Sequence, residues 1–154
     1  MGIIQVTATV RNPAAPDRTW DGLFLVDTGS IDCVVPANAL RGVGLQPQGS
    51  RTYELADGRH STVDIAVAQI EFMGEFVGAT VGFGPEDTEP ILGVTALESV
   101  GIEVDPVSQT LKRRHAVRMK TAASAALAGL PRSKARKRPE EMPLTASTNR
   151  GQAS

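Results

Sequence analysis

The sequence predicts an all-β domain with one or two short helices, followed by a basic tail. Before Lys112, apolar and β-branched runs are short and are interrupted by Gly, Pro and Asp, which leaves little room for a long helix. Charge divides at the same point. Residues 1–111 carry 5 Lys or Arg and 15 Asp or Glu, net −10, whereas residues 112–154 carry 11 and 2, net +9. The six aromatic residues also precede Lys112. We therefore expect a folded domain over 1–112 and a tail over 113–154.

The first elements are expected to be strands. Apolar residues at positions 4, 6, 8 and 10 alternate with their neighbours, which predicts a half-buried strand. A loop is expected over 12–17. Residues 22–27 form a continuous apolar run that ends in an acid, typical of a strand buried on both faces that places a polar group at its end. A short apolar run over 33–35 ends before Pro36.

A long hairpin is expected next. Strand-like runs over 51–56 and 61–72 flank Asp57-Gly58, and an Asp-Gly pair between such runs is a strong hairpin signal. The tip is therefore expected over 57–59. After Met73-Gly74 the sequence favours another strand over 75–82.

The end of the domain is expected to combine a helix with a closing hairpin. Thr95 and Glu98 match a capping box, which predicts a short helix from Ala96 to Gly101. Strands are expected over 102–105 and 109–112. In the tail, a helix is predicted over 116–129 and disorder over 131–154, because apolar residues are too few to offset the entropy of ordering.

Several classes of protein are disfavoured by composition. The single cysteine, Cys33, allows no disulfide within the chain, and with His60 and His115 it is too sparse for a structural zinc site. No apolar run approaches the length that spans a membrane, so no membrane partner is expected. The first residues lack the basic and apolar regions of a signal peptide, which predicts a cytoplasmic location.

The chemistry-bearing stretch is Asp27-Thr28-Gly29-Ser30, at the end of an apolar run. Burial disfavours a charged carboxylate, so hydrogen bonds from Thr28, Ser30 and the amide of Gly29 are expected to hold it. The structural alternative is an acid that caps an ordinary turn. Asp32 is interpreted as a surface acid, and Cys33 as a buried, inert thiol.

This stretch resembles the active-site loop of the retropepsin-like aspartic proteases, the retroviral-type, single-domain branch. Ile91-Leu92-Gly93 before a short helix resembles their apolar-apolar-Gly element, 64 residues after Asp27. The order of parts agrees over residues 3–112. The resemblance implies a closed β-barrel or sandwich, the acid-protease half, with a flap hairpin, and an aspartic endopeptidase that cleaves extended or unfolded polypeptide without metal or cofactor.

The resemblance also implies a homodimer, because one motif supplies one carboxyl and the chemistry needs two that share a proton. Asp27 of each subunit would be catalytic. Thr28 would bond across the two-fold axis, Gly29 would let the backbone approach closely, and Ser30 would bond the outer oxygen of Asp27. The hairpin tip, Ala56, Asp57, Gly58 and Arg59, would fold over the peptide.

Two features depart from that family. The hairpin tip is polar and charged where retroviral flaps are glycine-rich and apolar, and a 42-residue extension follows Lys112. An alternative function is therefore an inactive protease-fold module for dimerisation or peptide binding. Its basic tail would contact nucleic acid, by neutralising phosphates, or a partner, although a solvated tail is the favoured interpretation.

Overall fold

Strands dominate the structure, a computed structural model that describes residues 2–115 and 119. The expected tail helix and disordered segment lie outside the described residues. Within them the chain forms these elements in order: β1 (Gln5–Asn12), β2 (Ala15–Asp27), β3 (Cys33–Pro36), α1 (Ala37–Gly42), β4 (Gly49–Glu54), β5 (His60–Phe72), β6 (Glu75–Gly84), β7 (Ile91–Gly93), α2 (Val94–Ser99), β8 (Ile102–Asp105) and β9 (Thr110–Arg113).

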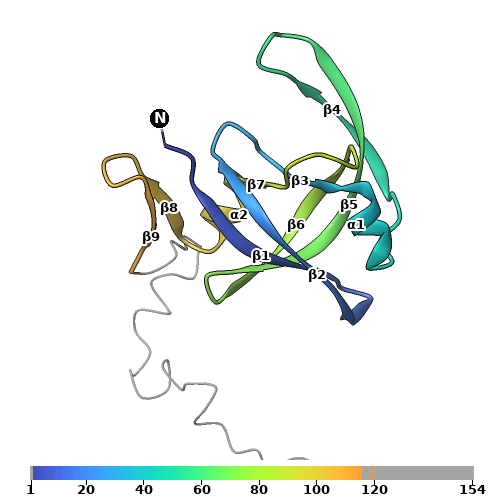
Figure 1. Cartoon of the computed structure of the whole chain (residues 1–154), viewed down its shortest axis with the longest axis horizontal. Coiled ribbons are helices and arrows are strands. Elements are labelled where there is room, and N and C mark those ends of the chain that lie inside the picture. Colours follow the sequence, from blue (N-terminus) through green and yellow to red (C-terminus); the bar gives the residue numbers. More distant parts are fainter. Residues whose placement is uncertain (1, 116–118, 120–154) are drawn as a thin grey trace, which may run out of the picture. The chain divides into compact units, whose positions relative to one another are not determined.

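Seven strands form one sheet in the order β1-β2-β7-β3-β6-β5-β4 (Figure 1). The sheet curls until β1 also pairs with β5, where Thr9–Arg11 face Gln69–Glu71 in antiparallel register. This pairing partly closes the sheet into a ring, and β4 extends from β5 outside the ring. Strands β8 and β9 form a separate hairpin. The all-β prediction with two short helices is thereby confirmed.

The strand β7 lies between β2 and β3, although it follows them by more than fifty residues. It runs parallel to β2, with Leu25 beside Ile91 and Asp27 beside Gly93. On its other side Ile91 pairs with Val34 of β3 in antiparallel direction. The chain from the end of β2 to the start of β3 must therefore bridge across the end of β7.

The hydrophobic core is formed by apolar side chains from nearly every element. Its largest fully covered side chains are Phe24, Leu40, Ile70, Leu92, Leu97 and Ile102. Burial of side chains of this size contributes about 1.5–3 kcal/mol each. Trp20 packs edge-on against Phe24, with ring centroids 6.1 Å apart. The core thus fixes the ends of β2 and β7, where Asp27 and Gly93 lie.

The strand alternation predicted from the first residues is confirmed, because Ala8, Val10 and Asn12 point inward from β1. Asn12 is a polar residue in the core, and its side-chain amide donates to the carbonyl of Val43 at 2.9 Å. This hydrogen bond offsets the cost of burying the amide and connects β1 to the chain after α1. The hairpin, the turn at Met73-Gly74 and the closing hairpin are also confirmed.

Three expectations about the elements are wrong. The loop expected over 12–17 is a tight turn, because β2 begins at Ala15 and pairs with Asn12. The strand over 22–27 is not buried on both faces, since Leu23 is 52% exposed while Phe24 is covered. The helix α2 has no side-chain cap and begins earlier than expected, at Val94. Its first amides instead donate hydrogen bonds to carbonyls of the loop after β2.

No helix in the described residues is long and apolar enough to cross a bilayer. Both helices span six residues.

Cys33 is predicted to react with thiol reagents only when the fold opens. Burial raises the pKa of its thiol to about 11, with a smaller raising contribution from Asp32 and a lowering one from the amide of Gly93. Below that pH the thiol stays protonated, and the thiolate is the reactive form. Maleimide labelling at pH 8, followed by mass spectrometry, should be at least about 100-fold slower in the folded protein than in denaturant. Equal rates in the two conditions would contradict the assigned burial.

Candidate active site

Asp27 ends β2 at the rim of the ring, where the loop of residues 28–32 begins. Two backbone hydrogen bonds hold the strand just before it: the amide of Leu25 donates to Pro90 and the amide of Val26 donates to Ile4, both at 2.8 Å. Asp27 itself lies beside Gly93 in the parallel pair of β2 and β7. The carboxylate is therefore carried by a strand that is held on both sides.

The loop orients the carboxylate of Asp27 with its own backbone and hydroxyl groups. The amide of Gly29 donates to Oδ1 at 2.9 Å, and the hydroxyl of Ser30 donates to Oδ2 at 3.3 Å, a long and weaker bond. The amide of Ser30 closes the turn on the carbonyl of Asp27 at 3.1 Å. Asp27 is half-buried, whereas Thr28 and Gly29 are exposed. The arrangement presents an oriented carboxylate on an open surface.

The second predicted element, Ile91-Leu92-Gly93, supports this loop from below. A β-carbon on Gly93 would lie 2.5 Å from the carbonyl oxygen of Asp32 and 2.7 Å from that of Ile31. Only glycine allows the two backbones to approach this closely. The loop that follows Asp27 can therefore pack against β7 only because residue 93 is glycine.

The helix α2 begins against the same loop. Its first amide, on Val94, donates to the carbonyl of Ser30 at 2.8 Å, and the amide of Thr95 donates to Ile31 at 3.4 Å. The first amides of a helix have no partner within it, so the loop carbonyls cap α2 in place of the expected Thr95–Glu98 box. Loop and helix consequently hold each other in place.

The predicted flap residues lie at the tip of the β4–β5 hairpin, which projects from the ring (Figure 1). Gly58 takes a φ of +82° in the turn, a conformation that favours glycine. Asp57 accepts from the amide of Arg59 at 3.0 Å and from its guanidinium at 2.6 Å. Both hydrogen bonds lower the pKa of Asp57, and the bond from the Arg59 amide is the larger cause. The tip is thus charged and exposed, and its contact with a peptide stays a prediction.

Asp32 is not the surface acid that the sequence suggested. Its side chain is 9% exposed, and it accepts a 2.7 Å hydrogen bond from the Tyr53 hydroxyl and a salt bridge from Arg51. Both donors lie on β4, more than 18 residues away in sequence. Their spacing of two along a strand places them on one face, which is the only sequence signal that points to this cluster. Asp32 is therefore already engaged within the chain and does not serve as a second free carboxylate beside Asp27.

In the part of the chain that the structure describes, no group of three or more His, Cys, Asp or Glu side chains is placed to hold a metal ion. The chemistry available at the loop is that of one carboxylate with hydroxyl and amide donors.

Comparison with solved structures shows the fold. A retropepsin-like aspartic protease from Rickettsia conorii superposes with a TM-score of 0.51 at 23% identity, over 68% of this chain and 77% of that one. The simian foamy virus (mac) protease gives a TM-score of 0.45 at 17% identity, over 61% and 91% of the two chains. No family model and no curated protein matches the sequence. The likeness to the rickettsial protein concerns the fold alone.

Substitution of Gly93 is predicted to destabilise the protein much more than substitution of Gly78. Gly93→Ala forces the loop backbone away from β7, and overpacking of this kind costs about 1–3 kcal/mol. Gly78 is an exposed strand glycine with open space around it, so Gly78→Ala should change the free energy of unfolding by less than about 0.5 kcal/mol. Urea unfolding of both variants at one protein concentration measures the difference. Equal stability of the two variants would show that the loop tolerates displacement.

Proposed function

From the retropepsin-like fold that the chain adopts, we propose that this protein is an aspartic endopeptidase that acts as a homodimer on extended or unfolded polypeptide. The observation that carries the proposal is the carboxylate of Asp27, at the end of a held strand with both oxygens bonded by its own loop. A turn-capping acid would need no second element beneath it, yet Gly93 and α2 brace this loop. We also propose that the protein acts in the cytoplasm.

The proposed reaction is direct attack of water on the peptide carbonyl. One carboxylate takes a proton from water while a neighbouring carboxyl group gives its proton to the carbonyl oxygen. The first group then passes its proton to the leaving nitrogen as the C–N bond breaks, and a hydroxyl on the former carbonyl carbon returns a proton to the second group. Two carboxyls about 3 Å apart do this well, because they cannot both ionise readily and so share one proton. A single chain brings one such group to the loop, so the second comes from Asp27 of another copy.

The surface beside Asp27 supports association with a second copy. The loop carries Ile31, whose side chain is 66% exposed. Close by, residues 2–4 run between the end of β2 and the β8–β9 turn: Ile4 accepts from Val26, and Gly2 lies against the Gln109 side chain. Ile3 on this segment is 76% exposed and Val107 in the turn is 91% exposed. These exposed apolar side chains are available for contact with a second copy.

Asp27→Asn is predicted to abolish cleavage while leaving the fold and the dimer intact. Asparagine keeps the size of the side chain but cannot exchange a proton, and loss of general acid–base catalysis lowers rates by about 10²–10⁴-fold. Digestion of an unfolded protein from about pH 4 to pH 8 measures it, with dimerisation followed in the same samples. In the wild type the rate should fall where both carboxyls of the pair are protonated and where both are ionised, so a rate that stays flat from acid to alkaline pH would contradict the shared proton. A folded wild-type dimer that cleaves nothing would favour the peptide-binding alternative.

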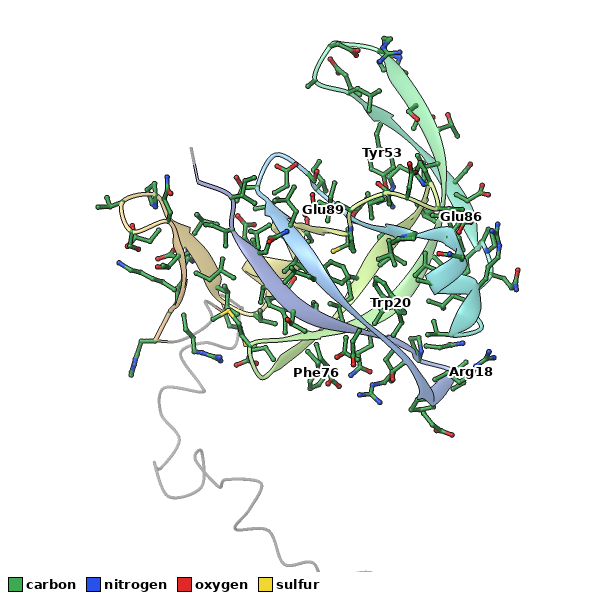
Figure 2. The ribbon with its side chains drawn as sticks, viewed as in Figure 1. Arg18, Trp20, Tyr53, Phe76, Glu86 and Glu89 are labelled. Atoms are coloured by element: carbon green, nitrogen blue, oxygen red, sulfur yellow. The ribbon has the colours of Figure 1, made fainter. Side chains whose placement is uncertain are left out.

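Ile31→Asp is predicted to separate the dimer and to remove the activity with it. The substitution places two like charges at the proposed two-fold axis, next to two Asp27 carboxylates. Phe76→Asp is the matched control, since Phe76 is 68% exposed and lies at the β5–β6 turn, on the far side of the ring from the β4–β5 hairpin (Figure 2). Sedimentation velocity should show monomers for the first variant and dimers for the second. Dissociation by Phe76→Asp instead would place the interface elsewhere.

A further inference from the structure

The β4–β5 hairpin has little support of its own where it leaves the ring. Residues 65–72 of β5 pair with β6, but residues 60–64 pair only with β4. Every residue of β4 is exposed except Tyr53. Segments with few buried contacts open at low free energy. The orientation of this arm over the catalytic loop therefore depends on a small number of side chains at its base.

One charged cluster joins that base to the loop after β2. Oδ2 of Asp32 accepts from the hydroxyl of Tyr53 at 2.7 Å and from the guanidinium of Arg51. Tyr53 lies opposite Ser61 and Arg51 opposite Val63 in the hairpin register, so these residues share the face that looks toward the ring. Figure 2 shows Tyr53 on that side of the hairpin. The side chain of Asp32 is nine-tenths covered whereas that of Arg51 is 46% exposed, so the acceptor end of the cluster is the buried one.

The loop end of this cluster is rigid. The backbone of Asp32 rests on Gly93 of β7, where even a methyl group would not fit, and its neighbour Ile31 accepts from the first turn of α2. The donors are also persistent. Burial, with the bond to Asp32 as a smaller cause, raises the pKa of Tyr53 to about 12, so its hydroxyl keeps its proton at neutral pH. The contact with Asp32 raises the pKa of Arg51 as well.

We propose that Asp32, Arg51 and Tyr53 form a clamp that fixes the β4–β5 hairpin over the loop carrying Asp27, with Asp32 as a positioning residue for polypeptide bound between them. The role in binding rests on the proposed peptidase function, whereas the mechanical link does not. The clamp connects the hairpin to the loop at Asp32, five residues after Asp27. Movement of the hairpin is therefore coupled to the conformation of the loop that carries Asp27. It restricts the hairpin to orientations near the one that accepts substrate.

The first test is hydrogen exchange of the hairpin amides, which needs no activity. Asp32→Asn keeps the shape of the side chain but removes its charge. Loss of a hydrogen bond to a charged group changes the equilibrium for local opening of the hairpin by about tenfold. Amides over 50–64 should therefore exchange about tenfold faster, while those of β1 and β6 are unchanged. Tyr53→Phe removes only one hydroxyl and should give a smaller increase in the same segment.

The matched control is Thr52→Val. The Thr52 hydroxyl bonds that of Thr62 at 2.7 Å on the opposite face of the hairpin, and valine keeps the β-branched shape. Its exchange should stay within about twofold of the wild type. Asp32→Asn combined with Tyr53→Phe should increase exchange by less than the product of the two single effects, because both substitutions act on one cluster. A Thr52→Val effect equal to that of Asp32→Asn, or no effect of either Asp32→Asn or Tyr53→Phe, would overturn the clamp.

The second test is kinetic. Its substrate is a synthetic peptide that spans a cleavage site identified in the digest of an unfolded protein. A loosened hairpin spends less time in the binding-competent orientation, which raises the apparent dissociation constant. Tyr53→Phe and Asp32→Asn should raise KM several-fold, with kcat within about twofold of the wild type. A fall in kcat without a change in KM would contradict the positioning role. Absence of cleavage by the wild type would refute the peptidase proposal, and the exchange result would still decide the clamp.

Discussion

The approach of β7 to the loop after β2 is the constraint on which the site depends. Gly93 lets its backbone lie directly beneath the carbonyls of Ile31 and Asp32, and the strand pairs on one side with the residues that lead to Asp27. Because α2 starts immediately after Gly93, its first two amides donate to the carbonyls of Ser30 and Ile31 in the same loop. One small residue therefore positions a strand end, a turn and a helix start together. The same turn carries the hydrogen bonds to the carboxylate, from the Gly29 amide and the Ser30 hydroxyl.

Local patterns in the sequence were enough to predict most of the elements. Alternation over residues 4–10, the Asp57-Gly58 turn and the apolar run into Asp27 each depend on neighbours in sequence, and the strands lie where these patterns placed them. The helix start was misjudged because its cap is tertiary: carbonyls some sixty residues earlier replace the Thr95–Glu98 box. The covered face of Asp32 was missed for the same reason, since its partners lie on β4. The resemblance of two short motifs, rather than any periodicity, indicated that they belong to one site.

The molecule divides into a well-packed ring and a sparsely packed arm, and the candidate site lies where they meet. Side chains such as Phe24, Ile70 and Leu92 are fully covered in the ring, whereas β4 is an exposed edge strand with charged residues. Charges on an edge strand discourage pairing with other chains, which suits an arm that would have to stay free to meet the proposed polypeptide substrate. This division keeps the carboxylate of Asp27 on the rigid part and leaves adjustment to the hairpin.

The late position of β7 in the chain also bears on how the protein is made. The strand must insert between β2 and β3, and the ring closes only when β1 meets residues 69–71. Pairings between such distant segments form slowly, because the entropy of closing the long intervening loop is lost before the contacts are gained. During synthesis, the turn that holds Asp27 therefore lacks its support until residues 91–95 have left the ribosome. The nascent chain would carry the carboxylate for most of its synthesis without the geometry that could make it reactive.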